Sequence, residues 1–286
     1  MCASAFVAMT YPHAVLAHAV SGGEGGGVFA DAFGTLLLVL LALVFAVGQW
    51  QVARRTRASR SRRALCFWAG WFVLALSLGP PLDEWSNVSF AAHMTQHELM
   101  MIVAAPLLVA ARPLGTLMWG LPKSVGVVIT SAAVRRIGTW LSAPLVAWIL
   151  HAVVLWAWHA PVAFEAGLHS VPVHWLQHAS FFAAAVIYWW SVFSSSARGT
   201  QKALAMVSVF TTAIHTALLG MLLTFSSHVW YATYTQTHNP WVLSAIEDQQ
   251  LGGLIMWVPG GVIFIVAAMV VGAAWLKQVD VRAARG

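Results

Sequence analysis

Long apolar stretches separated by short polar connections run along most of the chain. A transmembrane helix needs roughly 20 mostly apolar residues, because lipid offers no hydrogen-bond partner to an exposed backbone amide. Seven stretches approach that length, and they predict an all-α integral membrane protein with seven transmembrane helices. The expected helices cover residues 30–52, 64–79, 89–111, 144–159, 173–193, 203–226 and 249–276.

The composition supports a membrane protein and excludes several other classes. Of the 286 residues, 60% are hydrophobic and 8% are charged, against roughly 45–50% and 25% in soluble domains. The formal charge of +6 comes from basic residues scattered between apolar stretches, so we predict contact with a lipid bilayer and none with nucleic acid. Cys2 and Cys66 lie on opposite sides of the first apolar stretch, which excludes a cysteine-rich metal site.

The basic residues also predict an orientation. All 15 lie in the first, third and fifth connections and the C-terminal tail, whereas the second, fourth and sixth connections carry acids and no Lys or Arg. Because basic loops stay on the cytoplasmic side, the N-terminus is expected outside and the C-terminus in the cytoplasm. The predicted parts are an extracytoplasmic tail (residues 1–29), one transmembrane domain (30–277) and a cytoplasmic tail (278–286).

Two segments allow more than one interpretation. The first twenty residues hold an apolar run and the small-residue sequence Ala17-His18-Ala19, but no basic residue precedes them, so the segment is either a cleaved signal peptide or part of the tail. The connection from Arg112 to Trp140 contains Leu114, Met118 and Trp119. It either lies along the cytoplasmic membrane surface or is an ordinary loop.

Histidines carry the main chemical signal. His93 and His97 are four residues apart near the outer end of the third predicted helix, and His174 and His178 have the same spacing near the outer end of the fifth. Residues four apart share a helix face, and the two pairs lie at one depth. Imidazole is the commonest metal ligand, so these pairs predict a metal or heme site.

Other candidate groups are weaker. His159 ends the fourth helix, and His151 and His215 lie deeper, where a histidine either binds a metal or ties helices together. The thioethers of Met101 and Met256 favour copper or simply fill the core. Glu98, Glu247 and Asp248 are candidate partners of the imidazoles, although acids that open the last helix also stabilise its N-terminus. His228 and His238 are expected to be solvated.

Five sequence motifs, in order between about residues 80 and 275, resemble the CtaG-type cytochrome c oxidase assembly factors. This is the multi-helix family known from Gram-positive bacteria, unrelated in fold to the single-span factor that shares its name. The motifs are His93-Met94-Thr95-Gln96-His97, Trp158-His159-Ala160-Pro161, His174-Trp175-Leu176-Gln177-His178 with Phe181-Phe182, Leu222-Leu223-Thr224-Phe225-Ser226, and the run from Asp248 to Gly261. Gln177 and Ser191 stand where many members are expected to have an acid and a proline.

The resemblance implies a non-enzymatic membrane protein that helps to mature a heme–copper oxidase. Its expected cargo is copper, its expected partners are oxidase subunit I and an extracytoplasmic copper chaperone, and its expected location is the bacterial plasma (inner) membrane. Carried over by position, the implied metal ligands are His93, His97, His159, His174, His178 and Asp248.

Two other functions fit the same residues. A membrane cytochrome would bind heme between one histidine of the third helix and one of the fifth, but this leaves half of the histidines unexplained. A copper transporter would use His151 and His215 to continue a path inward, yet no acid-lined route reaches the cytoplasmic side. No nucleophile, phosphate-binding loop or acid/base pair indicates an enzyme.

Overall fold

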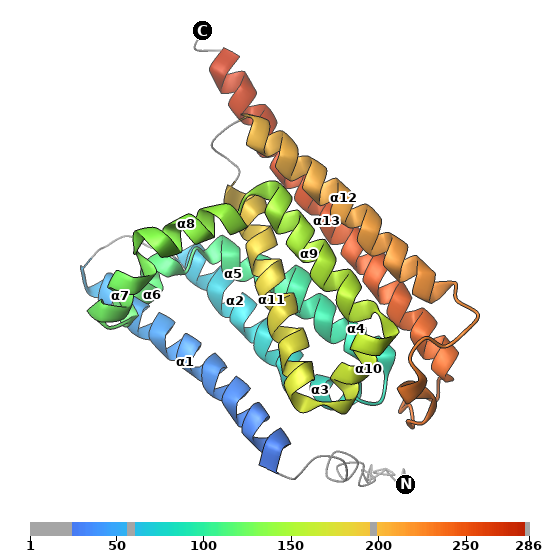
Figure 1. Cartoon of the computed structure of the whole chain (residues 1–286). Helices are drawn as coiled ribbons and strands as arrows, with labels where there is room; N and C mark the ends of the chain where they lie inside the picture. The colour runs from blue at the N-terminus through green and yellow to red at the C-terminus, as the bar shows by residue number, and fades with distance from the viewer. Residues whose placement is uncertain (1–24, 56–60, 195–198, 284–286) are drawn as a thin grey trace, which may run out of the picture.

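The computed structural model describes residues 25–55, 61–194 and 199–283, which form a bundle of helices (Figure 1). Cys2 and residues 1–24 of the predicted tail lie outside the described residues. Every one of the seven predicted stretches is helical. The corresponding helices are α1 (Gly25–Arg55), α2 (Ser61–Leu78), α4 (Phe90–Glu98) with its continuations, α9 (Pro144–His159), α11 (Val171–Ser194), α12 (Gly199–Thr224) and α13 (Ala245–Ala283).

Among the described residues, four helical segments are each long and apolar enough to cross a membrane: residues 33–54, 90–111, 202–224 and 245–273. A fifth is added if α9 and the preceding α8 (Ala132–Leu141), which meet at 71°, form one bent span. Two helices that we predicted to span, α2 and α11, are not in this set. In α11 the polar side chains of His174, Gln177 and His178 reduce the apolar character. The chain therefore has several membrane-type helices, while seven spans and the orientation stay predictions.

The third predicted span is a helix of three parts. After α4 the chain forms a π-helical turn, η2 (Leu99–Ala104), and then continues as α5 (Ala105–Ala111). Pro106 lies in the first turn of α5 and has no N–H to donate to the preceding turn. Most residues of α4 are buried, including the polar His93, Gln96 and His97, so polar groups occupy the interior of the bundle.

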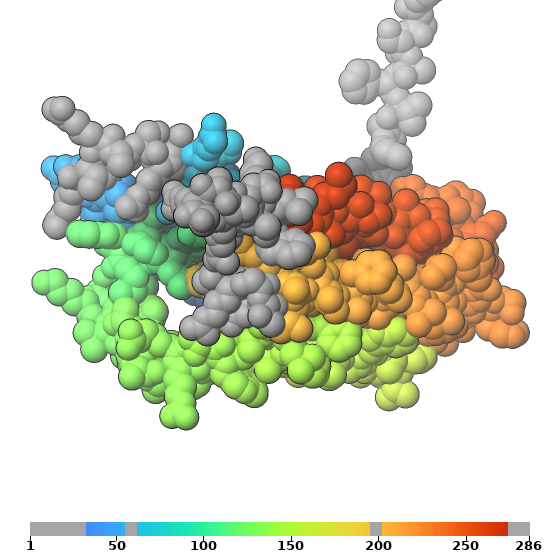
Figure 2. All heavy atoms as spheres, turned by 90° about the horizontal axis from the view of Figure 1, so that it is seen from above, coloured from blue at the N-terminus to red at the C-terminus, as the bar shows by residue number. Residues whose placement is uncertain are grey.

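The remaining helices surround α4 and α11. Helices α12 and α13 pack along their length, α13 also contacts α4, and α12 contacts α9. The view from above shows α12 between α13 and the green α9 (Figure 2). Gly220 of α12 and Gly253 of α13 allow this close approach, because a Cβ added at Gly220 would lie 2.8 Å from the Gly253 carbonyl oxygen.

Short helices mark the two ends of the bundle. Helices α3 (Leu82–Ser86) and α10 (Pro161–His169) and the 3-10 turn η4 (Ala232–Thr235) lie at the lower end in Figure 1, which we call the histidine end. Helices α6 (Leu114–Gly120), α7 (Lys123–Ile129) and α8 lie toward the opposite end. The connection from Arg112 to Trp140 is therefore helical rather than an ordinary loop, and its position on a membrane surface stays a prediction.

Candidate metal centre

Three histidines from two helices converge at the histidine end. One ring nitrogen from each of His93, His174 and His178 lies within 4.8 Å of those of the other two, and the described residues offer no other such group of three among His, Cys, Asp and Glu. His93 and His178 are buried, and His174 is half-buried. Metal–nitrogen bonds of about 2 Å place two ligands of one ion up to about 4 Å apart, so only a small adjustment separates this arrangement from a coordination sphere.

The spacing along the helices explains this convergence. One turn apart on α11, the rings of His174 and His178 have centroids 4.2 Å apart, and His93 of α4 lies 5.7 Å from His174. His97 is adjacent, with its ring 4.4 Å from His93 and 5.2 Å from His178. It does not belong to the group of three, and both of its ring nitrogens are buried without a hydrogen-bond partner. The structure thus brings together three of the four paired histidines and places the fourth beside them.

A hydrogen-bond relay orients the His93 ring. The Tyr234 hydroxyl donates to the Ser86 carbonyl oxygen at 2.9 Å, and its oxygen lies 3.2 Å from His93 Nδ1. Burial raises the pKa of Tyr234 well above its ordinary value, so the phenol keeps the proton that it donates. His93 Nδ1–H must then be the donor to Tyr234, which leaves His93 Nε2 with a free lone pair and no partner. Such outer hydrogen bonds fix the tautomer of metal-binding histidines.

His159 has the same tautomer but lies outside the group of three. Its Nδ1 lies 2.7 Å from the Leu155 carbonyl oxygen, which can only accept, so Nδ1 carries the proton and Nε2 is unpartnered. The His159 ring lies 5.9 Å from Phe181, whose ring is 4.6 Å from His97. His159 therefore shares an aromatic neighbour with the cluster and could accept a metal only after some rearrangement.

Asp248, a ligand candidate from the resemblance, binds the N-terminus of α4 instead. Its carboxylate accepts hydrogen bonds from Ser89 Oγ (2.7 Å), Phe90 N (2.6 Å) and Ala91 N (3.3 Å). Backbone N–H groups at a helix start have no partner within the helix, and a carboxylate there also complements the helix dipole. Asp248 thus holds the start of the helix that carries His93. The N-terminal role expected for the last helix belongs to Glu247, which accepts from Ser244 N and Oγ.

The other sequence candidates are spread over the bundle. Glu98 faces α13, because its Oε2 lies 3.3 Å from a Cβ added at Gly260, and this oxygen is buried without a partner. Met101 and Met256 are buried in the apolar core. Gln177 is buried, and its amide faces Gly167 of α10. His151 and His215 form a separate pair, with ring centroids 6.1 Å apart.

No role was predicted from the sequence for Tyr231 and Tyr234, two side chains that contact the histidine-bearing helices. Tyr231 precedes η4 and Tyr234 lies within it, in the loop between α12 and α13, and both are buried. The Tyr231 hydroxyl donates to the His159 carbonyl oxygen at 2.9 Å, so this loop contacts two histidine-bearing helices. The available signal was modest: they are two of only four tyrosines in the chain and lie three residues apart, and a buried tyrosine hydroxyl usually has a partner.

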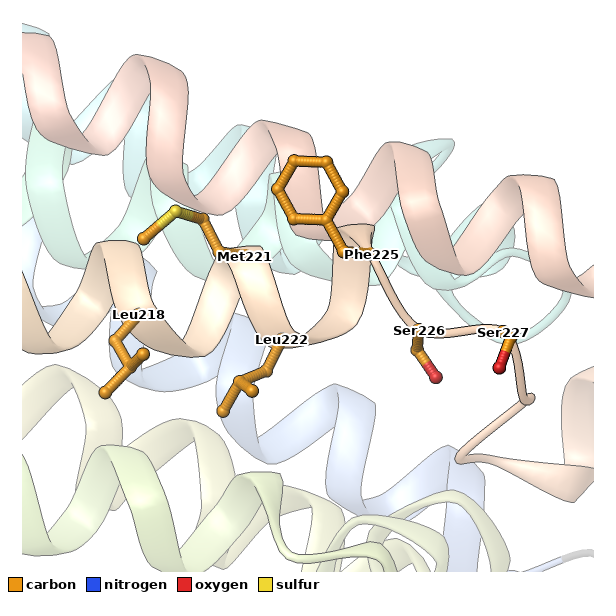
Figure 3. A pocket seen from close by; sticks show the side chains of 6 residues that line it. All are labelled: Leu218, Met221, Leu222, Phe225, Ser226 and Ser227. Atoms are coloured by element: carbon orange, nitrogen blue, oxygen red, sulfur yellow. The ribbon is translucent and has the colours of Figure 1, made fainter.

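A shallow hollow lies on the surface of α12, away from these imidazoles (Figure 3). Its lining is Leu218, Met221, Leu222, Phe225, Ser226 and Ser227. Phe225 is 75% exposed. The lining has the single thioether of Met221 and no imidazole or carboxylate, so the hollow lacks the several ligands that a metal site needs.

Comparisons with known proteins agree with the sequence motifs. A model of the cytochrome c oxidase caa3 assembly factor family (Caa3_CtaG) matches residues 43–278. Uncharacterised proteins of Mycobacterium bovis and Mycobacterium tuberculosis are each 24% identical over 254 residues, which cover 84% of this chain and 38% of the relative. The chain thus spans well under half the length of these relatives. No solved structure matches.

Proposed function

Because this chain belongs to the cytochrome c oxidase caa3 assembly factor family, a family of assembly factors and not of enzymes, we propose that it handles copper for the oxidase. In this proposal the cluster of His93, His174 and His178 binds copper in the bacterial plasma membrane and delivers it to oxidase subunit I. A copper chaperone outside the membrane supplies the ion. Copper is the cargo of this reaction, not a resident cofactor.

The observation that carries the proposal is the set of unsatisfied imidazole nitrogens. Nε2 of His93 and Nε2 of His178 are both buried and without a hydrogen-bond partner, although buried polar atoms normally have one. Imidazole nitrogens suit copper. No carboxylate belongs to the group of three, and the cost of burying an ion rises with the square of its charge, so neutral ligands favour Cu(I) over a divalent ion.

Three protein ligands also suit a site that must release its cargo. A site with three ligands keeps an open position for an incoming group, whereas a closed set of four holds its metal. His97 and His159 lie nearby with unpartnered ring nitrogens. Either could replace a ligand during transfer, so the copper would move by exchange of one ligand at a time.

Copper titration of the purified protein tests the proposal. Detergent-solubilised parent protein is loaded with Cu(I) against a chromophoric chelator, beside His93→Asn/His178→Asn. We expect the variant to lose one tightly bound equivalent of copper. His228→Asn is the matched control, since His228 is exposed in the loop after α12. A double variant that binds as much copper as the parent contradicts the proposal.

An assay in cells tests the link to the oxidase. The same variants replace the chromosomal copy, and the copper content and activity of the purified oxidase are measured. Loss of oxidase copper in the double variant and retention in His228→Asn supports delivery. The visible spectrum of the purified assembly factor separates the heme alternative, because a Soret band would favour a membrane cytochrome.

A further inference from the structure

We propose that His151 and His215 form a second binding site for Cu(I), deeper in the bundle than the cluster at the histidine end. The site joins α9 to α12. That copper reaches this site in the cell rests on the proposed function. Binding of Cu(I) at the site can be measured independently.

The two rings lie across the α9–α12 contact, with their planes tilted by 56°. Their centroids are 6.1 Å apart, a separation at which one ion could bind a nitrogen of each ring through bonds of about 2 Å once the rings turn toward it. The His151 ring lies 4.9 Å from Tyr188 of α11, and the His215 ring lies 6.0 Å from Trp148 of α9. An aromatic ring therefore lies beside each histidine of the pair.

Unsatisfied polar atoms point to a ligand between these helices. His151 Nδ1, both ring nitrogens of His215 and Trp148 Nε1 are buried and without hydrogen-bond partners. An unsatisfied buried donor or acceptor costs about 1–3 kcal/mol, and a concentration of them in one place indicates an ion or water that completes their bonding. The indole N–H can only donate, so the two imidazoles are the groups that can bind a cation.

The surroundings select a soft ion with a single charge. Neither His151 nor His215 belongs to a group of three His, Cys, Asp or Glu ligands in the described part of the chain. A divalent ion would bring two uncompensated charges into a medium of low dielectric constant, at about four times the solvation cost of one charge. Cu(I) carries one charge and is stable with two nitrogen ligands, so this pair of neutral imidazoles fits it.

His151 and His215, which we call the inner pair, are separate from the cluster at the histidine end. His151 lies two turns from His159 on α9, a rise of about 12 Å, and the buried Leu155 lies between them on the same helix. The pair also lies beside an exposed apolar part of α12. His215 is half-buried, and its neighbours on α12, Ile214 and Leu218, are 52% and 46% exposed. Copper at this pair would be accessible to a membrane protein docked against α9 and α12.

The test is the Cu(I) stoichiometry of the full chain in detergent. Parent protein, His151→Asn/His215→Asn, His93→Asn/His178→Asn and the control His228→Asn are titrated against a chromophoric chelator, and gel filtration checks that each is monodisperse. We expect two equivalents in the parent and in His228→Asn, and one in each double variant. His215→Cys keeps a soft ligand and is expected to recover the second equivalent in the presence of His151, whereas a purely structural role of His215 predicts no such recovery.

The outcomes separate the two proposals. If the inner double variant binds as much copper as the parent, the inner site is wrong and the cluster at the histidine end is unaffected. If only the inner double variant loses copper, the inner site stands and the proposed cluster is wrong. Should the inner double variant fail to fold, X-ray absorption of the parent decides: a second equivalent with two nitrogen neighbours supports the pair, and its absence overturns it.

Discussion

The histidine cluster and the inner pair use the same side chain in two different environments. At the histidine end, the Tyr234 hydroxyl orients His93 and the Leu155 carbonyl orients the neighbouring His159, so that Nε2 is free in both. In the inner pair, both nitrogens of His215 lack a partner. An imidazole held in one tautomer loses less freedom when it binds a metal. The cluster is thus the preorganised site, and we expect the inner pair to bind copper more weakly.

Because the two sites depend on different parts of the fold, a substitution can weaken copper binding at one of them alone. The cluster depends on the start of α4 and on the loop that carries Tyr234, whereas the inner pair depends on the contact between α9 and α12. Substitutions in one region are therefore expected to change copper binding at that site and spare the other.

The largest effect is expected for Asp248→Ala. The substitution leaves Ser89 Oγ and the backbone N–H groups of Phe90 and Ala91 without their acceptor. Hydrogen bonds to a charged group contribute about 1.5–3 kcal/mol each, and the contributions are not additive, so we expect a loss of about 3–5 kcal/mol of unfolding free energy. Because α4 carries His93, copper binding at the cluster is expected to fall as well.

Unfolding in mixed detergent and copper titration measure this effect. Glu247→Gln is the matched control, since Glu247 is the neighbouring acid, is exposed and accepts its hydrogen bonds from Ser244. The control is expected to keep both copper sites. An Asp248→Ala protein with parental stability and copper binding would contradict the capping role.

The next effect is expected at the crossing of α12 and α13. A Cβ at Gly220 would lie 2.8 Å from the Gly253 carbonyl oxygen and 2.9 Å from Trp257 Cβ. Gly220→Ala is therefore expected to push α12 away and to cost about 1–3 kcal/mol, as overpacking does. His215 is on the same helix, so we expect weaker copper binding at the inner pair and unchanged binding at the cluster.

Gly261→Ala on α13 is the control, because a Cβ there meets nothing within 4 Å. The two variants are compared by thermal unfolding and by the two-site copper titration. Equal losses at both copper sites in Gly220→Ala would show that the sites are not separable in the way proposed.

A moderate effect, limited to the cluster, is expected for Tyr234→Phe. The change removes the hydroxyl that binds His93 Nδ1 and the Ser86 carbonyl but keeps the ring. Loss of an outer hydrogen bond to a metal-binding group typically lowers metal affinity about 10–100-fold. Copper affinity is measured by chelator competition, and Ser77→Ala is the control, because Ser77 bonds only within its own helix. Unchanged affinity would mean that Tyr234 does not position His93.

The sequence predicted the positions of helices better than it predicted contacts between side chains. The apolar stretches located every long helix, because the requirement for about 20 apolar residues is local. The i, i+4 spacing brought His174 and His178 together for the same reason. The contacts of Asp248 could not be predicted because its partners, Ser89 to Ala91, lie about 158 residues away in the chain. Tyr234 was missed because the fold of a loop decides what it contacts.

The smallest effect is expected for Ser180→Ala, between the two sites. Ser180 Oγ accepts a hydrogen bond from Trp158 Nε1 at 2.8 Å and so joins α11 to α9. Interhelical hydrogen bonds of this kind contribute on average about 0.6 kcal/mol in a membrane protein, so we expect a comparable loss of unfolding free energy and parental copper binding at both sites. Ser77→Ala, whose hydroxyl bonds within α2, provides the comparison in the same unfolding assay. A Ser180→Ala protein that lost copper from both sites would show that the α9–α11 contact couples them, and the cluster and the inner pair would then be parts of one site.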